Sequence, residues 1–332
     1  MVTIKDIAAL SGVSIGTVST ILNRSDNTIK VRETTRKRVL EAAGKLKYTP
    51  NLNAKALKMD RSFVIGVMAP RIVGSFVPDI LEGIEDFFME NNYSMLLSEF
   101  EDESEFMSKC RIMKQKRVEG IIVVSGNDEL NRVYASGNIA LPLIGVGYSV
   151  PFANSAFVKV DGRKIAYIAT RYLLNLGHRN IAFLYHGKYY TDRVDGWRQA
   201  LTEYDIPKAG QLLLPDGIGY EGGREMFRRL MLLKEMPTAL LAYSDELAAG
   251  IMNEAFAQGF KVPEDLSIIG TDDMSFSKML RPALTTIKQP KGEQGKIAAQ
   301  LMNAILNKKS PENVLLEPEL IIRDSCRKYV KP

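Results

Sequence analysis

The side chains best suited to chemistry in this 332-residue chain are an arginine and an aspartate that lie far apart in the sequence. Arg193 offers five fixed N–H donors, which suit vicinal hydroxyls, a carboxylate or a phosphate. Asp272 ends the apolar run LSIIGT, and open α/β folds bind ligands at the carboxyl ends of their strands. Both residues are therefore candidates for a ligand site, and a mutual or surface salt bridge is the alternative.

Signals for enzyme chemistry are weaker. The segment Gly217–Gly222 matches GxGxxG, and Asp245 follows at about the 20-residue spacing of a dinucleotide site. Two residues, one of them proline, separate this segment from the preceding strand, so a glycine-rich turn entering a helix is the better interpretation. His178 and His186 have no acidic or cysteine partner at metal-ligand spacing, and no nucleophile elbow is found. We expect no enzyme activity, no metal and no cofactor, and an NAD-dependent enzyme is the least favoured alternative.

A different kind of site is predicted in the segment Thr3–Asn23, TIKDIAALSGVSIGTVSTILN. Thr3 and Asp6 fit a capping pattern at the start of one helix, Gly12 permits a sharp bend, and Ser14 can cap a second helix. Two helices at this spacing predict a helix-turn-helix, whose second helix lies in a DNA major groove. An ordinary helical hairpin inside a core is the alternative.

The residues of this segment divide into two faces. The inward face is expected to hold the apolar residues Ile7, Ala8, Leu10, Val18, Ile21 and Leu22. The outward face of the second helix is expected to hold Ile15, Gly16, Ser19 and Thr20.

The distribution of charge supports the DNA interpretation. Residues 1–62 carry 12 Lys and Arg against 5 Asp and Glu, a net charge of +7, whereas the remainder carries 32 against 34, a net charge of −2. A basic N-terminal part on a nearly neutral body is typical of a protein with a polyanionic partner. A solvated, helix-rich surface would give the same asymmetry without such a partner.

The composition also indicates where in the cell the protein is expected. No apolar run reaches the roughly 18 residues of a membrane helix, and Lys5 and Asp6 interrupt the first apolar stretch, so no signal peptide or membrane contact is expected. Cys110 and Cys326 are the only cysteines. Because two thiols provide no disulfide framework, we expect a cytoplasmic protein.

The elements that hold these residues form a head, a linker and a body. A third helix is expected from Arg32 to Leu46, with Val39, Leu40 and Ala43 covering the first two helices, so residues 1–49 form an all-α head. Residues 50–62 form a hinge, in which Asn51 can cap one short helix. Such a helix is marginal in water, and a flexible linker is the alternative.

Residues 63–332 read as an α/β body. Short apolar runs alternate with helical segments such as PDILEGIEDFFMENN; the runs are FVIGVMA, SMLLSEF, GIIVVSG, PLIGVG, NIAFLYHG, TALLAYSD and LSIIGTDD. Buried parallel strands are continuous apolar runs joined by right-handed helical crossovers. The number of units predicts two doubly wound, parallel-sheet lobes with a ligand-binding cleft between them.

These segments resemble the lactose-repressor/galactose-repressor (LacI/GalR) family. IKDIAALSGVSIGTVSTILN and RKRVLEAAGKLKYTPNLNAKAL carry a dense match over residues 3–58, and LLNLGHRNIAFLYHG, TDRVDGWRQAL, VPEDLSIIGTDDM and RPALTTIKQP extend it more loosely through residue 325. The resemblance implies a ligand-responsive transcriptional regulator, a repressor of sugar-utilisation genes that binds a near-palindromic DNA operator as a homodimer. Part of the family also responds to a phosphorylated carrier protein, which the residues leave open. A small-molecule binding protein without a DNA role is the alternative.

The resemblance also assigns DNA-facing residues. Leu57 matches a leucine of the hinge helix that wedges a base step open in the minor groove, and its neighbours match minor-groove and phosphate contacts. Thr20 occupies a position where relatives often have arginine, and Gly16 has no side chain. We therefore expect few direct contacts between α-helical side chains and base edges in the major groove. The full expected set is Thr3, Ser14, Ile15, Gly16, Thr17, Ser19, Thr20, Asn23, Asn51, Ala54, Lys55 and Leu57.

In the body, the resemblance implies a fold like that of a periplasmic sugar-binding protein. The chain would cross between lobes near 158–162, 287–291 and 321–325. The N-terminal lobe would comprise 63–160 plus 290–322, and the C-terminal lobe 161–289 plus 323–332.

The same resemblance places effector-binding residues in the cleft. Arg193 and Asp272 match ligand-binding residues, and Phe76, Val77 and Phe157 match parts of the cleft wall. Ile218 falls where relatives often present an aromatic ring, and Ser244 where a sugar-binding relative has asparagine, so the ligand could differ from that of relatives. We expect a sugar or sugar phosphate. Trp197 could face the cleft, but a core position is the better interpretation.

Overall fold

The computed structural model describes most of the chain and divides it into two compact units, residues 1–62 and 63–332. The described residues are 2–22, 31–48, 61–70, 76–137, 139–185, 191–206, 213–215 and 218–330.

The first unit contains three helices around a small apolar core. They are α1 (Ile4–Ser11), α2 (Ile15–Leu22) and α3 (Glu33–Lys45). At the start of α1, the Thr3 backbone N–H and hydroxyl both donate to Asp6 Oδ2 at 2.8 Å. Gly12 ends α1 in the left-handed region at φ 65°, which a residue without a Cβ adopts at no steric cost. The bend of 109° between α1 and α2 matches the expected helix-turn-helix.

Two leucines of this unit do not lie where the sequence analysis expected. Leu10 is 54% exposed and Leu40 is 49% exposed, whereas Ile7, Val18 and Val39 are fully buried. The core face of α1 follows the spacing of Ile7, Ala8 and Ser11, and that of α3 follows Val39 and Ala42. Leu10 and Leu40 point to other sides of α1 and α3, away from these core faces.

The N-terminal lobe of the second unit is a parallel six-stranded sheet with the order β11-β5-β4-β3-β1-β2. Its strands are β1 (Val64–Ala69), β2 (Ser94–Glu99), β3 (Ile121–Val124), β4 (Leu143–Val146), β5 (Ser155–Val160) and β11 (Val314–Leu316). The helices α5 (Phe76–Glu90) and α12 (Lys291–Leu306) share one apolar cluster with the sheet. The helices α6 (Glu103–Gln115) and α7 (Asp128–Ser136) share a second cluster.

The C-terminal lobe repeats this architecture with the strand order β12-β10-β9-β8-β6-β7, in which only β12 is antiparallel to its neighbour among the described strands. Its strands are β6 (Ile181–Tyr185), β7 (Leu213–Pro215), β8 (Ala239–Ala242), β9 (Ser267–Asp272), β10 (Thr285–Lys288) and β12 (Glu319–Ile321). Its helices are α8 (Gly162–Asn175), α9 (Thr191–Glu203), α10 (Gly219–Met231) and α11 (Asp245–Ala257). Helices α8 and α9 contribute to one apolar cluster, and α10 and α11 to another.

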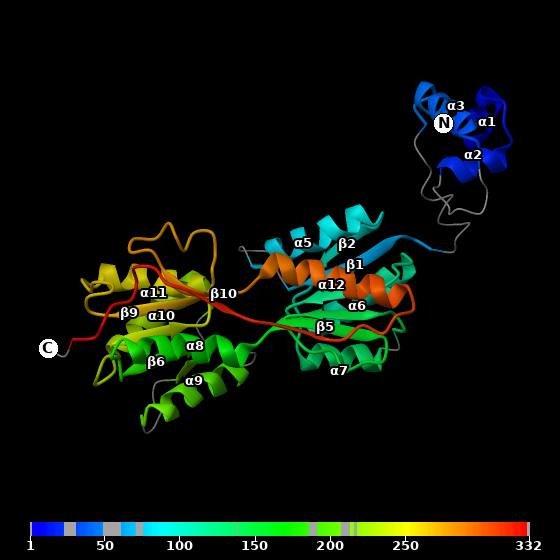
Figure 1. Cartoon of the computed structure of the whole chain (residues 1–332). Coiled ribbons are helices and arrows are strands. Elements are labelled where there is room, and N and C mark those ends of the chain that lie inside the picture. Colours follow the sequence, from blue (N-terminus) through cyan, green and yellow to red (C-terminus); the bar gives the residue numbers. More distant parts are fainter. Residues whose placement is uncertain are drawn as a thin grey trace. The chain divides into compact units, whose positions relative to one another are not determined.

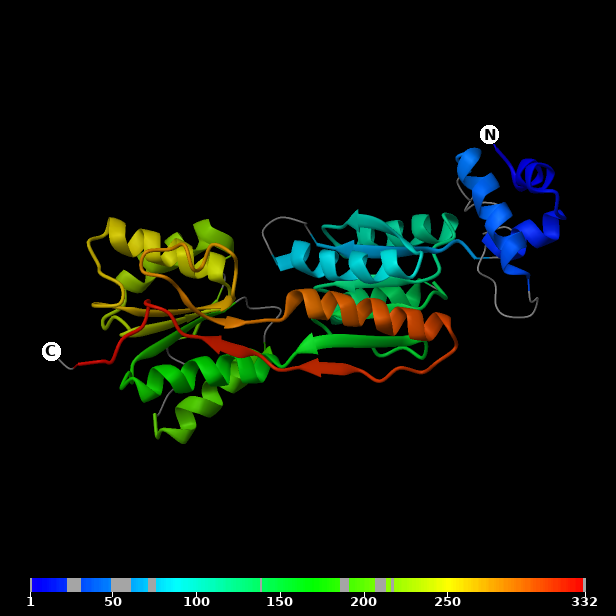
Figure 2. The same ribbon diagram turned by 45° about the horizontal axis from the view of Figure 1, so that its top comes forward.

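Three connections join the two lobes, as Figures 1 and 2 show. The chain passes from β5 to α8, from β10 to α12, and from β11 to β12. The third passage lies between Leu316 and Glu319, before the range 321–325 that the resemblance implied, because β12 already pairs with β10 of the C-terminal lobe. Residues 319–321 therefore belong to the C-terminal sheet.

Within the described ranges, no single helix is long and apolar enough to span a membrane. Helices α1 and α2 meet such a test only when taken together as a bent pair.

Candidate functional site

The outward face of α2 is exposed in the first unit. Ser14, Ile15 and Gly16 are exposed, and Thr17, Ser19 and Thr20 are partly exposed. Ser14 Oγ accepts a hydrogen bond from the Thr17 N–H at 3.2 Å and lies 2.9 Å from Thr17 Oγ1, as expected of a helix cap. Thr3 is also exposed. The structure thus presents this part of the expected DNA-facing set to solvent.

Two features of this face limit base reading. The Thr20 hydroxyl donates to the Gly16 carbonyl oxygen at 3.0 Å within α2, so its proton is already used. Gly16 has open space on its outer side, where a Cβ would find only Ser14 Oγ, at 3.8 Å. The remaining predicted DNA contacts, Asn23, Asn51, Ala54, Lys55 and Leu57, lie outside the described residues.

A cavity of about 450 Å³ opens between the two lobes of the body. Six of the seven predicted effector-binding residues line it: Phe76, Val77, Arg193, Ile218, Ser244 and Asp272. Phe157 does not belong to this lining, and its ring instead lies 5.6 Å from the Lys159 Nζ. Trp197 is fully buried in the core of the C-terminal lobe, 6.3 Å from the Phe183 ring.

Arg193 enters the cavity from α9. Its Nη1 donates to the Tyr243 carbonyl oxygen at 2.8 Å, and its own backbone N–H donates to Asp192 Oδ1 at 2.9 Å. The side chain is only 5% exposed, so the surface salt bridge considered from the sequence does not describe it. The bond to Tyr243 joins α9 to the end of β8 and fixes the guanidinium against the cavity. A guanidinium is suited to oxygen atoms of a ligand.

Asp272 ends β9 and is 8% exposed. Its Oδ1 accepts a hydrogen bond from Gln289 Nε2 at 2.6 Å, and its backbone φ is 113°, a conformation that non-glycine residues rarely adopt. Burial raises the pKa of Asp272 to about 7, and the negative charge of Asp245 acts in the same direction, against Arg193, Gln289 and Lys291. A strained, buried carboxyl group that titrates near neutrality is typical of a functional site.

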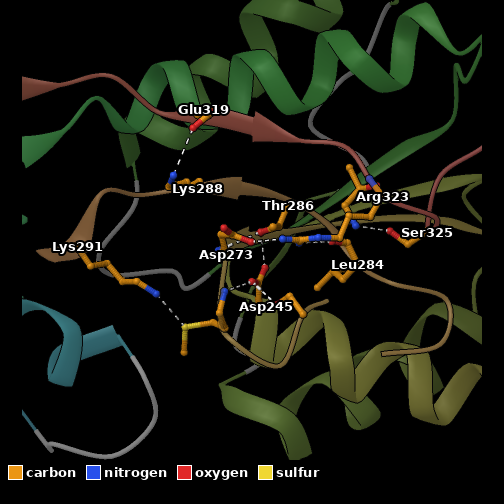
Figure 3. Close-up of polar contacts among 12 residues, drawn as sticks. Asp245, Asp273, Leu284, Thr286, Lys288, Lys291, Glu319, Arg323 and Ser325 are labelled. Carbon is orange, nitrogen blue, oxygen red and sulfur yellow. Dashed lines mark hydrogen bonds and ion pairs between the residues drawn. The ribbon is translucent and has the colours of Figure 1, made fainter. Parts of the chain in front are cut away.

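Asp245 holds the backbone around Asp272 in place. Its Oδ2 accepts hydrogen bonds from the Met274 N–H at 2.8 Å and the Ser277 hydroxyl at 2.6 Å, and its Oδ1 accepts from the Thr286 hydroxyl at 2.5 Å. Figure 3 shows this carboxylate beneath the strand ends, beside the ion pair of Asp273 and Arg323. Asp245 therefore fastens the loop after β9 to β10 and to the start of α11.

The same contacts answer the rival dinucleotide interpretation. Asp245 is fully buried and its oxygens face three donors of the protein itself, so it does not face a ribose. Helix α10 begins at Gly219 with φ 62°, as a glycine-rich turn entering a helix would. Gly217 lies outside the described residues. His178 bonds Thr238 and the Arg327 carbonyl oxygen, which is a structural role.

Several residues that line the cavity were not predicted from the sequence. These are Phe100, Glu101, Asp102, Glu103, Asn127, Tyr243, Glu246, Met274 and Gln289. Most follow directly after β2, β3, β8 or β9, so their positions at strand ends were a signal that could have identified them. Among the described residues, no group of three or more His, Cys, Asp or Glu side chains is arranged to hold a metal ion.

Comparison with known proteins gives a consistent result. The family described as bacterial regulatory proteins, lacI family, matches residues 3–51, and the periplasmic binding protein-like domain matches residues 170–326. The chain is 33% identical to the HTH-type transcriptional regulator DegA of Bacillus subtilis (strain 168) over 334 residues, which are 97% of each protein.

Two solved structures are similar over nearly the whole chain. The lac repressor dimer bound to operator and the anti-inducer ONPF has a TM-score of 0.84 and 26% identity, with 98% of this chain and 99% of that chain covered. The transcriptional regulator CelR–cellobiose complex has a TM-score of 0.72 and 25% identity, with 98% of this chain and 100% of that chain covered.

Proposed function

This chain belongs to the LacI family of DNA-binding bacterial transcriptional regulators, and we propose that it is a repressor controlled by a small polyhydroxylated effector. The family consists of regulators and not of enzymes, so the alternative of an NAD-dependent enzyme is excluded. The match of the head to the family likewise removes a binding protein without a DNA role.

The main support for the effector proposal is that Arg193, Asp272 and Gln289 line one cavity between the lobes. A guanidinium, a carboxyl group and an amide together supply donors and acceptors, which neighbouring hydroxyl groups of a sugar can satisfy at once. The cellobiose complex of the similar regulator supports the proposal that the effector is a carbohydrate. Ile218 and Ser244, which differ from the residues expected of relatives, are compatible with a carbohydrate other than cellobiose.

The proposed mechanism couples the cavity to DNA through the lobes. An effector that contacts residues of both lobes favours one arrangement of the lobes over another, and this changes how two N-terminal lobes pair in a homodimer. That pairing decides whether the two hinge segments can form helices together on the operator. The effector controls DNA binding only through its different affinity for the two states.

A homodimer with two heads requires an operator with two related half-sites. Selection of bound DNA from random sequence, with and without candidate sugars, tests this directly. The expected result is a near-palindrome whose enrichment changes when the effector is added. If no palindrome is enriched, the repressor proposal fails.

The hinge has its own test. We expect Leu57→Ala to reduce operator affinity and DNA bending while leaving effector binding intact, because an apolar wedge unstacks a base step and bends the duplex. Unchanged affinity for the selected operator would exclude the wedge. Ala54 and Lys55 are proposed to contact the adjacent minor groove and phosphates.

A further inference from the structure

The lining of the interlobe cavity is strongly acidic. Among the described residues it carries five carboxyl groups, and its single basic side chain is Arg193. The carboxyl groups come from both lobes: Glu101, Asp102 and Glu103 from the N-terminal lobe, and Glu246 and Asp272 from the C-terminal lobe. The body as a whole carries a net charge of only −2, so negative charge is concentrated at this cavity. Low-dielectric walls strengthen the resulting field toward a ligand.

Two of these carboxylates are available to a ligand. Glu103 and Glu246 are each partly buried, face the cavity from opposite lobes, and form no ion pair with another side chain of the described residues. A carboxylate that forms no ion pair within the protein can accept charge-assisted hydrogen bonds from a ligand cation.

Four helix N-termini at the cavity, those of α6, α7, α11 and α10, do not favour an anion. Three of them are already capped by the protein: Asp102 Oδ1 accepts from the Glu105 N–H at 2.8 Å, Asn127 Oδ1 from the Leu130 N–H at 2.9 Å, and Ser244 Oγ from the Leu247 N–H at 3.2 Å. These N–H groups would otherwise bind phosphate.

The last of these four helices, α10, has no side-chain cap at Ile218. Its first turn nevertheless contains Glu221, and Glu246 lines the cavity beside its first residue, Gly219. Their negative charges oppose binding of an anion at this helix end as well.

From this lining we infer that the effector carries a protonated amine and neither a phosphate nor a carboxylate group: it is an amino sugar or another aminopolyol. The inference rests on the effector-controlled function proposed above. Arg193, Asp272 and Gln289 bind the hydroxyl groups, and the three N–H donors of the ammonium group interact with Glu103 and Glu246. Because these glutamates belong to different lobes, the ammonium group also draws the two lobes together.

Matched sugars test the charge of the effector. Glucose, galactose and mannose are each titrated into the full-length protein as the parent sugar, the 2-amino sugar and the 6-phosphate, by calorimetry and by thermal unfolding near pH 7. In the series that binds, we expect the amino sugar to bind about tenfold more tightly than the parent, and the 6-phosphate to bind about tenfold more weakly. Tighter binding of a parent or a phosphate overturns the inference, and so does the absence of binding by every compound.

Variants of the two glutamates test the site. We expect Glu103→Gln combined with Glu246→Gln to abolish the preference for the amine while the parent sugar still binds, and each single change to remove part of it. Glu312→Gln, at an exposed position outside the cavity, is the control and should leave the preference unchanged. Retention of the full preference in the folded double variant overturns the inference. Operator selection is independent of these titrations, so failure of the repressor proposal is recognised separately.

Discussion

Lys291 Nζ lies 3.0 Å from Asp79 Oδ2, although the lysine side chain is only 6% exposed and the aspartate side chain is 46% exposed. Lys291 is the first residue of α12, immediately after the second connection between the lobes, and Asp79 lies in the first turn of α5. The same Nζ, drawn in Figure 3 with the dashed line that leaves Lys291, lies 3.5 Å from Met274 Sδ of the C-terminal lobe. One buried cation therefore contacts both lobes beside the cavity.

We expect Lys291→Met to lower the free energy of unfolding by about 1–3 kcal/mol, because it leaves Asp79 without its partner and removes a positive charge near Asp272. Urea denaturation of the full chain measures the change. Lys288→Met is the control: Lys288 and Glu319 form a more exposed ion pair at 3.6 Å, which contributes less than about 1 kcal/mol. Equal effects of the two changes would show that the pair of Lys291 and Asp79 stabilises the fold no more than the exposed pair does.

Burial explains part of the difference between the strands that the sequence predicted and those that it did not, although the predicted β2 has no fully buried position and the unpredicted β10 is mostly buried. The runs that form β3, β4 and β8 are buried at every position, so their continuous apolar character identified them. Strand β5 alternates between partly buried and buried residues, and β11 and β12 have three residues each and no fully buried position. Their pairing depends on neighbours far away in the chain, which periodicity within a short segment does not reveal.

Asp245→Ala is expected to lower the free energy of unfolding by about 1–3 kcal/mol, because it deprives the Met274 N–H and the hydroxyls of Ser277 and Thr286 of their acceptor. It should also weaken effector binding, since Met274 and Asp272 line the cavity. Asp265→Ala is the matched control, because Asp265 accepts the Lys261 N–H on the surface at 2.7 Å. Titration calorimetry and denaturation that give the same result for both variants would contradict the positioning role.

The pKa of Asp272 predicts a pH dependence of stability. A carboxyl group whose pKa is raised to about 7 binds its proton more tightly in the folded state than in the unfolded state. Its contribution to the unfolding free energy is therefore complete below the unfolded pKa near 4 and is lost as the pH rises to about 7.

Asp272→Asn isolates this contribution from that of Asp245, whose pKa is also raised, to about 6. The variant should lose less stability than the wild type between pH 4 and pH 7, and above that range the difference between the two proteins should stay constant. Urea denaturation across this pH range measures the difference. Parallel stability profiles of the two proteins would contradict the raised pKa.

The candidate site was predictable to the extent that single residues occupy strand ends or match a family motif. Arg193 and Asp272 were found in this way. Gln289 forms a hydrogen bond with Asp272, and Asp245 forms one with Thr286. Because these partners are distant in the sequence, no local spacing of residues predicts either hydrogen bond. The negative charge of the cavity could not be predicted from the sequence, because its carboxyl groups come from two lobes and from segments more than a hundred residues apart.

In the head, Thr20→Val tests the use of the threonine hydroxyl. Because this hydroxyl already donates to the Gly16 carbonyl oxygen, we expect the contact of Thr20 with DNA to be made by its methyl group. Valine keeps that group, so operator affinity should change by less than about 0.5 kcal/mol, whereas Thr20→Ala should cost about 1 kcal/mol. Fluorescence anisotropy with the selected operator distinguishes the two. Equal losses for valine and alanine would assign the contact to the hydroxyl.

Gly16→Ala separates the stability of the head from its contact with DNA. A Cβ at Gly16 meets only Ser14 Oγ, at 3.8 Å, so alanine should stabilise α2 by up to about 1 kcal/mol, measured by hydrogen exchange in the full chain. Gly44→Ala is the control, because a Cβ at Gly44 of α3 meets nothing within 4 Å. If Gly16 makes no base contact, operator affinity should stay within about threefold of the wild type for both variants. A large loss confined to Gly16→Ala, with the stability gain intact, would show that DNA approaches the backbone at Gly16 too closely for a side chain.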